Sequence, residues 1–117
     1  MIEPNKKYSS PLGNRYSSPE MSYIWSDHNK YTGWRKLWCS LAKNQKSLGV
    51  QISDSQIVEM ESNISNIDMD EVDKHESQTN HDVVSHMNHY VDVAPSCENI
   101  IHIGATSQYL VDNQDII

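Results

Sequence analysis

Two short segments of the chain combine hydrogen-bond donors with the residues typical of a helix start. Thr79, His81 and Asp82 open one segment, and Thr106 with Ser107 follow a Gly-Ala turn in the other. The first backbone N–H groups of a helix are unpaired and carry the positive end of its dipole, so they bind phosphate or carboxylate. A histidine at this position donates to an anionic oxygen while the neighbouring acid orients its ring. The segments predict anion binding, although Thr and Ser are also common helix caps and the Thr79–Asp82 spacing is that of a capping box.

A further candidate for anion recognition is the pair Arg15 and Tyr16, which precedes the first expected helix. An arginine fork beside a phenol recognises phosphate well, but a surface arginine next to a packing tyrosine is the commoner arrangement. His86 and His89 share one helical face, yet no third ligand has matching spacing, so we expect no zinc and a structural role for both. The sequence has no glycine-rich phosphate loop and no nucleophile elbow, and we expect no cofactor and no metal.

The hydrophobic spacing predicts an all-α fold that positions these residues. Ser18-Pro19-Glu20 begins a long helix whose apolar stripe runs to Leu48, with Gly49 as its stop. Further helices are expected to start at Ser53, Asp68 and Thr79, and a last one contains residues 109–116. The apolar run at residues 100–103 fits either a strand or a buried helical turn. We expect an extended arm over residues 1–17 and a helical domain over residues 18–117.

The charge of the chain is unevenly distributed along its length. The net charge is -7, but residues 1–49 carry eight basic and three acidic side chains, whereas residues 50–117 carry one basic and thirteen acidic ones. This balance argues against nucleic-acid binding and is typical of a solvated acidic face, or of attraction between the two parts within or between subunits. The stretch without charged residues, 99–111, is too short to span a membrane. Two cysteines and no secretory signal indicate reduced thiols and a cytoplasmic location.

Several motifs together resemble the beginning of the adenylosuccinate lyases, members of the fumarase/aspartase superfamily. They occur in the family's order, and the resemblance runs from about Tyr8 to the end of the chain. The motifs are Tyr8-Ser-Ser-Pro-Leu-Gly-Asn-Arg15-Tyr16-Ser-Ser-Pro-Glu-Met21, Trp34-Arg-Lys-Leu-Trp38, His81-Asp-Val-Val-Ser-His86 and Ile101-His-Ile-Gly-Ala-Thr-Ser107 with Asp112-Asn113. The resemblance implies the family's amino-terminal helical domain without its central bundle of long helices. It also implies an enzyme that eliminates fumarate from adenylosuccinate, giving AMP, and from the related imidazole-carboxamide ribotide in purine synthesis.

The resemblance also implies roles for the candidate residues. Arg15 and Tyr16 match the pair that contacts the nucleotide at its phosphate, and His81 with Asp82 match a substrate-binding pair. The hydroxyls of Thr106 and Ser107 match those that hold a succinyl carboxylate, and the complete enzyme is a homotetramer. The chain departs from the family at Asn80, where an arginine is usual; losing a charge-assisted contact costs about 1.5–3 kcal/mol.

The family's catalytic acid and base have no counterpart among these residues. The chain also ends inside an apolar pattern, so we expect an amino-terminal piece of a longer protein or a subunit that a partner completes. We therefore expect the chain alone to bind substrate groups without turnover. Two alternatives remain open: a non-catalytic helical module that associates with full-length lyase subunits, and a chain that is not stable by itself.

Overall fold

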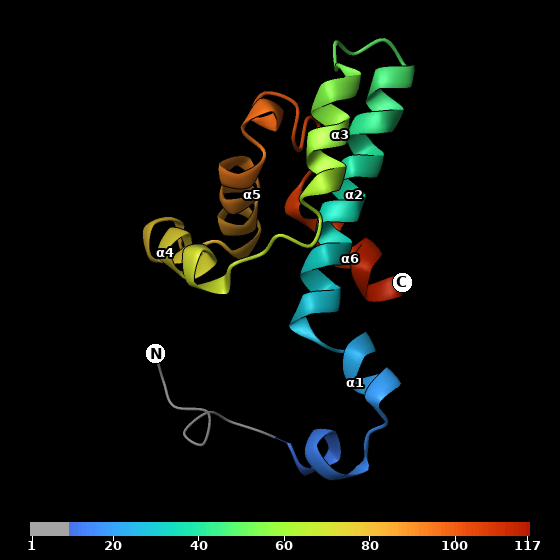
Figure 1. Ribbon diagram of the computed structural model, residues 1–117, viewed down its shortest axis with the longest axis vertical. Helices are drawn as coiled ribbons and strands as arrows, with labels where there is room; N and C mark the ends of the chain where they lie inside the picture. Colours follow the sequence, from blue (N-terminus) through green and yellow to red (C-terminus); the bar gives the residue numbers. More distant parts are fainter. Residues whose placement is uncertain (1–9) are drawn as a thin grey trace. The chain divides into compact units, whose positions relative to one another are not determined.

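Helices make up the regular structure of the described part of this chain. The computed structural model describes residues 10–117, and no β-strand occurs in that range, so the expected all-α class is confirmed. In chain order the elements are a π-helical turn η2 (Leu12–Tyr16), α1 (Pro19–Ile24), α2 (Asp27–Ser47), α3 (Asp54–Ser62), α4 (Met69–Thr79), α5 (Asp82–Val93), a 3-10 turn η3 (Pro95–Cys97) and α6 (Ser107–Ile116) (Figure 1). No helix between residues 10 and 117 is both long and apolar enough to cross a membrane.

The chain divides into two compact units, Met1–Lys30 and Tyr31–Ile117. The boundary between the two units follows Lys30, whereas the sequence predicted a boundary after residue 17, at the end of an extended arm. Residues 1–9 of that expected arm lie outside the described residues, and its remainder is not extended as predicted. Pro11 has helical backbone angles (φ -56°, ψ -32°), and Leu12–Tyr16 continue from it as a π-helical turn. Proline is pre-organised for the first position of a helical turn, and here that preference outweighs the loop composition around it.

The expected single helix from residue 18 to Leu48 is two helices, α1 and α2. Ser18 caps α1 as predicted, since its hydroxyl accepts from the Met21 N–H at 3.1 Å. The break follows Trp25, where the Ser26 hydroxyl accepts from the Asn29 N–H at 3.1 Å and so caps α2. Ser-Asp is a strong helix-start sequence, and here it begins a new helix inside the apolar pattern.

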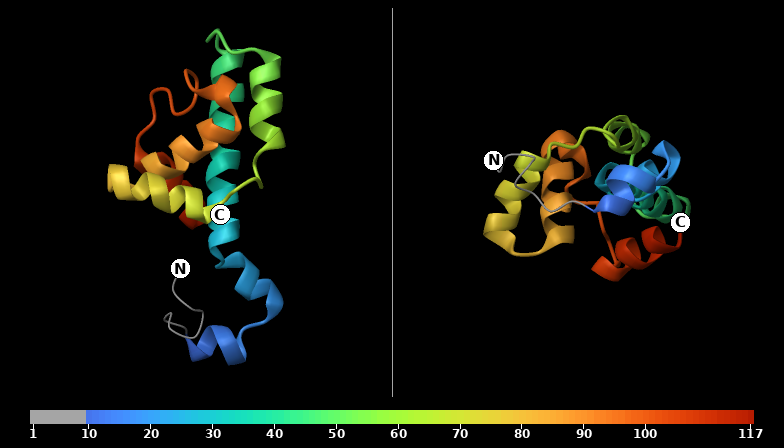
Figure 2. Two further views of the ribbon diagram at one scale, coloured as in Figure 1. Left: turned by 60° about the vertical axis from the view of Figure 1, so that its left-hand side comes forward. Right: turned by 90° about the horizontal axis from the view of Figure 1, so that it is seen from below.

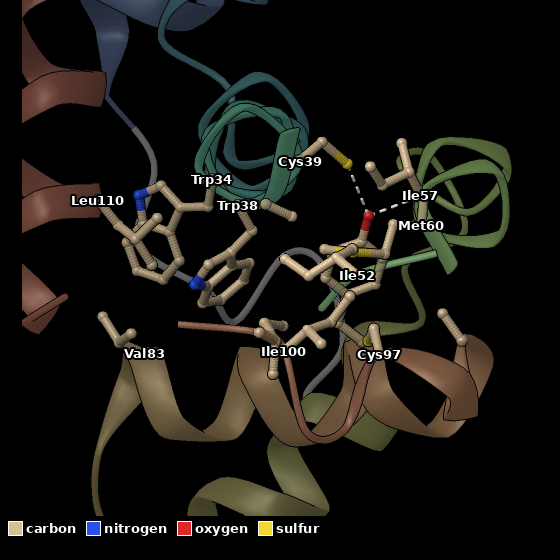
Figure 3. Close-up of a cluster of buried hydrophobic side chains, with 14 residues drawn as sticks. Trp34, Trp38, Cys39, Ile52, Ile57, Met60, Val83, Cys97, Ile100 and Leu110 are labelled. Atoms are coloured by element: carbon tan, nitrogen blue, oxygen red, sulfur yellow. Dashed lines mark hydrogen bonds between the residues drawn. The ribbon is translucent and has the colours of Figure 1, made fainter. Parts of the chain in front are cut away.

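The core of the second unit is built around the two tryptophans of α2. Trp34 and Trp38 are each 1% exposed, and the buried residues of the other helices pack around them, as Figure 3 shows. The predicted stripe is thus correct at its centre, but Leu48 at its end is 84% exposed. Gly33, one residue before Trp34, lies against α6, because a Cβ at this position would meet the side chain of Gln114. This close approach accounts for a glycine in the middle of a helix.

Helix α3 returns alongside α2 (Figures 1 and 2). Gly49 has a left-handed backbone (φ 99°), and the Val50 N–H donates to the Gln45 carbonyl at 3.0 Å, so the predicted helix stop is confirmed. The predicted capping box of α3 is also present. Two ion pairs join the helices, Lys43 with Glu61 and Lys46 with Asp54.

Arg35 is a buried cation that ties α2 to the segment between α3 and α4. It is 1% exposed, and its Nη1 donates to the carbonyls of Asn63 at 2.5 Å and Asn66 at 2.8 Å. Its guanidinium also lies 4.4 Å from the ring centroid of Tyr90 on α5. Burial lowers its pKa to about 10, against 12.5 for a free side chain, because the interior disfavours the charged form. Arg35 thus fixes the path of the chain toward α4 and, through it, toward α5.

Candidate functional site

The first candidate site lies at the tight turn between α4 and α5. Asn80 ends α4 in the left-handed conformation (φ 51°, ψ 35°), which asparagine tolerates better than most residues. His81 is the N-cap of α5, and Asp82 is its first residue. Thr79 is the last residue of α4 and not a cap of α5, so the predicted Thr79 capping box is wrong. The left-handed turn at Asn80 moves the start of the helix two residues along the chain.

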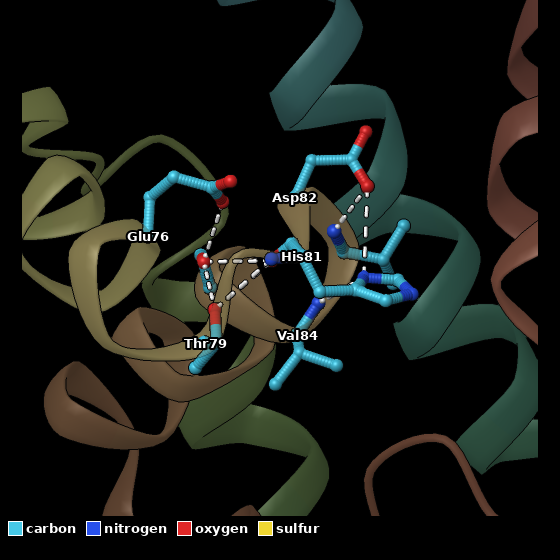
Figure 4. A network of polar contacts seen from close by, with 7 residues as sticks. Glu76, Thr79, His81, Asp82 and Val84 are labelled. Carbon is cyan, nitrogen blue, oxygen red and sulfur yellow. Dashed lines mark hydrogen bonds and ion pairs between the residues drawn. The ribbon is translucent and has the colours of Figure 1, made fainter.

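His81 and Asp82 close the start of α5 with their own side chains (Figure 4). The Asp82 carboxylate accepts from the Val83 N–H at 2.8 Å, and the His81 Nδ1 accepts from the Val84 N–H at 3.4 Å. The Asp82 oxygen also lies 3.6 Å from His81 Nδ1. When Nδ1 accepts a hydrogen bond, the neutral ring carries its proton on Nε2. The side chain of His81 is 47% exposed and that of Asp82 65%, so the site offers a ring N–H donor and a carboxylate to solvent. The backbone N–H groups of Val83 and Val84 lie at the helix start where the sequence predicted anion binding, but they already donate to Asp82 and His81.

Two polar residues behind this turn, Ser85 and Glu76, were not among the predicted site residues. The Ser85 hydroxyl is within hydrogen-bond distance of the Glu76 carboxylate, the Thr79 hydroxyl and the His81 carbonyl. Ser85 is fully buried. The only sequence signal for this arrangement is a serine one helical turn after His81, a spacing that also occurs on exposed helix faces.

The second candidate site lies at the start of α6. Thr106 is the N-cap as expected, but its side chain makes no capping hydrogen bond, and Ser107 is the first helical residue. Thr106 is exposed and Ser107 half-buried. In contrast to α5, this helix start is not closed by the side chain of its N-cap, although the Tyr109 N–H donates to the Thr106 carbonyl at 3.1 Å. The two hydroxyls and the first N–H groups of the helix therefore suit an external acceptor.

Helix α2 holds the loop that leads to Thr106. The Trp38 Nε1–H donates to His102 Nδ1 at 3.0 Å, and the Gln45 Nε2–H donates to the Ile103 carbonyl at 2.7 Å. His102 has a left-handed backbone (φ 66°), and burial lowers its pKa. The segment around it is a series of turns and not a strand. The N–H groups of Ile100 and Ile101, both buried, donate to the Cys97 carbonyl at 3.0 and 2.9 Å, so the first part of the apolar run forms the buried helical turn that was one of its two interpretations.

The structure brings the two helix starts to one core cluster. Val83 follows Asp82 directly and Leu110 comes three residues after Ser107; both are buried and pack near Trp34 (Figure 3). Arg15 and Tyr16 are exposed residues of the π-helical turn and belong to the other unit. The structure therefore groups four of the six predicted residues in one unit, and the ligand-binding roles of all six remain predictions.

The paired histidines of α5 are both buried in the second unit. His86 is 3% exposed and stacks on the Tyr31 ring at a centroid distance of 3.9 Å. His89 is equally buried, and its Nε2 accepts from the Asp68 N–H at 2.9 Å. Burial lowers the pKa of His89, with a smaller contribution from the nearby Arg35 cation. Both rings are therefore occupied in packing the unit.

Sequence comparison identifies adenylosuccinate lyases among the relatives of this chain. The chain is 38% identical over 113 residues to the adenylosuccinate lyase of Saccharomyces cerevisiae. The matched segment is 94% of this chain and 23% of that protein. The adenylosuccinate lyases of Schistosoma mansoni and Caenorhabditis briggsae are 39% and 40% identical, covering 96% and 95% of this chain and 23% and 24% of their own lengths. No protein-family model matches the chain.

The similarity extends over nearly the whole chain, and it agrees with the family that the Arg15, His81 and Ser107 motifs indicated. The chain spans less than a quarter of the length of these curated relatives. It is therefore related by sequence to the adenylosuccinate lyases, over a segment that forms only part of each of those proteins.

Proposed function

We propose that this chain supplies substrate-binding groups of an adenylosuccinate lyase. That enzyme eliminates fumarate from adenylosuccinate, giving AMP, and from the succinylated imidazole-carboxamide ribotide of purine synthesis. The observation that carries the proposal is the identity of 38–40% to adenylosuccinate lyases over at least 94% of the chain. The exposed donors at the starts of α5 and α6 support it.

The assigned roles follow the chemistry of each group. Adenylosuccinate has a phosphate, two carboxylates and several hydroxyl and amine donors. The outward Nε2–H of His81 suits a ligand oxygen, and the Asp82 carboxylate suits a ligand hydroxyl or amine. Thr106 and Ser107 at the uncapped start of α6 suit a succinyl carboxylate. Arg15 and Tyr16, in the other unit, suit the phosphate.

We place the catalytic acid and base outside these residues. The elimination needs a base for the Cβ proton and an acid for the leaving nitrogen. The two histidines buried in α5 are engaged in ring stacking and in a hydrogen bond to the backbone, which supports a structural role. We propose that the acid and base belong to the part of the relatives' length that this chain does not match, in a cytoplasmic homotetramer.

Calorimetric titration with adenylosuccinate tests the binding role. The His81→Ala variant should lose about tenfold or more in affinity, since a hydrogen bond to a charged group contributes about 1.5–3 kcal/mol. Ser107→Ala should also bind more weakly. Ser53→Ala is the matched control, because it weakens the start of α3 and leaves both candidate sites intact. Failure of the parent chain to bind adenylosuccinate, alone and in the presence of a full-length lyase, would refute the proposal.

A fumarate-release assay tests the placement of the acid and base. The chain alone should release no fumarate, and substantial release would contradict that placement.

A second candidate function is a non-catalytic module that associates with full-length lyase subunits. Its support is the set of large apolar side chains that the first unit exposes, together with the basic and acidic parts of the sequence. Those side chains are Leu12, Tyr16, Met21, Tyr23, Ile24 and Trp25. Mixing with a full-length lyase should then change the oligomer mass or the activity, and no change in either would exclude this function.

A further inference from the structure

The Ser85 hydroxyl occupies the centre of a polar network that joins α4 to α5. Its oxygen lies 2.9 Å from Glu76 Oε2, 2.7 Å from Thr79 Oγ1 and 2.7 Å from the His81 carbonyl. The Thr79 hydroxyl in turn accepts from the His81 N–H at 3.3 Å. Figure 4 draws this network as dashed lines between the ends of the two helices, with Glu76, Thr79 and His81 labelled. These partners of the Ser85 hydroxyl belong either to the end of α4 or to the start of α5.

Proton counting limits the arrangements of this network, in which both hydroxyls also lie within hydrogen-bond distance of the His81 carbonyl, Ser85 at 2.7 Å and Thr79 at 3.3 Å. A hydroxyl has one proton to donate, so Ser85 and Thr79 can together make two donor bonds. A carboxylate is the strongest acceptor available, so the Ser85 proton goes to Glu76. The Thr79 proton then goes to the Ser85 oxygen at 2.7 Å, which is closer than the His81 carbonyl at 3.3 Å. The His81 carbonyl keeps the Ser85 N–H as its donor. The result is a continuous series from the His81 N–H through Thr79 and Ser85 to Glu76. Each bond in such a series polarises the next, which strengthens the whole.

This series holds the backbone from which the His81 side chain projects. The His81 N–H is bound to Thr79, and the His81 carbonyl accepts from the Ser85 N–H at 3.0 Å. Both peptide groups that flank the histidine are therefore fixed to residues of the network. The ring is then held in place by the Val84 N–H. A buried hydroxyl without partners is costly, so the network cannot loosen at one member without disturbing the others.

We propose that Ser85, with Thr79 and Glu76, is the positioning residue for His81: it fixes the ring so that Nε2–H faces the ligand. The identity of the ligand, adenylosuccinate, rests on the proposed function, whereas the positioning of His81 by the network does not. Ser85 itself does not touch the ligand. Its role is to reduce the conformational freedom that His81 would otherwise lose on binding.

The experiment compares variants that remove and keep the hydroxyls. Ser85→Ala and Thr79→Val interrupt the series, whereas Thr79→Ser keeps it and is the matched control. In the chain without ligand, the Val84 amide should exchange with solvent at least about threefold faster in the two interrupted variants, and the His81 ring nitrogens should show mixed tautomers by NMR. Thr79→Ser should match the parent within about twofold, and affinity for adenylosuccinate should fall about three- to tenfold in the interrupted variants alone.

The outcomes separate this inference from the proposed function. Unchanged Val84 exchange and unchanged His81 tautomers in both Ser85→Ala and Thr79→Val would overturn the positioning role, whether or not the chain binds adenylosuccinate. Absence of binding in the parent, with the expected exchange changes, would overturn the proposed function and leave the positioning role supported. Thr79 is only half-buried, so Thr79→Val provides the test even where Ser85→Ala does not fold.

Discussion

Replacing Tyr90 by phenylalanine removes one hydroxyl from the centre of the core. Tyr90 is completely buried on α5, and its hydroxyl donates to the Met60 carbonyl of α3 at 2.5 Å. The Cys39 sulfur of α2 lies 3.2 Å from the same oxygen. A single O–H group therefore links three helices, and burial raises the pKa of the phenol, which keeps it protonated.

The expected loss of stability depends on which hydrogen bonds remain after the Tyr90 hydroxyl is removed. The Met60 carbonyl retains the Asn63 N–H at 3.2 Å, so it is not left without a donor. The loss is then that of one neutral hydrogen bond plus a small void, about 1–1.5 kcal/mol. That is a sizeable part of the about 5–15 kcal/mol that stabilises a domain.

Urea denaturation followed by circular dichroism measures this difference. Tyr109→Phe is the matched control, because the Tyr109 hydroxyl also donates to a helix carbonyl, that of Leu37 at 3.1 Å, but Tyr109 is only half-buried. Water can replace the lost partner there, so we expect a loss of at most about 0.5 kcal/mol. Equal losses for the two variants, or none for Tyr90→Phe, would refute the argument that the buried hydroxyl joins the three helices.

Three further predictions follow from single positions. Burial lowers the pKa of His89 and His102, so the unfolded state binds more protons than the folded state at mildly acidic pH. The free energy of unfolding should therefore fall as the pH drops below about 6.5. Urea titrations at pH 7 and 5.5 should show this fall in the parent and not in the double variant His89→Gln, His102→Asn. The Asn80→Arg variant, which has the family's usual residue, should lose about 1 kcal/mol of stability in urea denaturation, because arginine tolerates the left-handed turn less well than asparagine. It should also bind adenylosuccinate more tightly in calorimetric titration. A variant as stable as the parent would contradict the backbone argument. Gly33→Ala should stabilise the chain by about 1 kcal/mol in a Gln114→Ala background and by less in the parent, and a double-mutant cycle that shows no such coupling would argue against contact between these residues.

Local features of this fold could be predicted from the sequence because local chemistry decides them. Ser18, Ser53 and Gly49 act within a few residues of themselves, and their caps and stop occur as expected. The spacing of Trp34 and Trp38 similarly identified the buried face of α2. These signals give the helical class and most helix starts without knowledge of distant contacts.

The features that the sequence did not predict depend on distant partners or on competing local signals. The Trp38–His102 hydrogen bond joins residues far apart in the chain, and no periodic pattern encodes it. Arg35 lies in a position that polarity alone would assign to the surface, yet backbone carbonyls and the Tyr90 ring accept it in the core. At residue 26 the apolar pattern predicts a continuous helix, but the Ser26 hydroxyl caps the start of α2 and a new helix begins there.

The candidate site shows how a helix start can be prepared by a residue that faces the interior. Helix α5 buries Val83, His86 and Tyr90 on one face, and Ser85 is buried as well, although a hydroxyl gains little from leaving water. Its burial is sustained by Glu76 and Thr79 of α4, so the same contacts that make the serine tolerable also fix the end of one helix to the start of the next. Because His81 lies between those two ends, its orientation depends on the packing of α4 against α5. Substitutions that loosen this packing should therefore affect His81 before they unfold the unit, and the exchange rate of the Val84 amide reports that change directly.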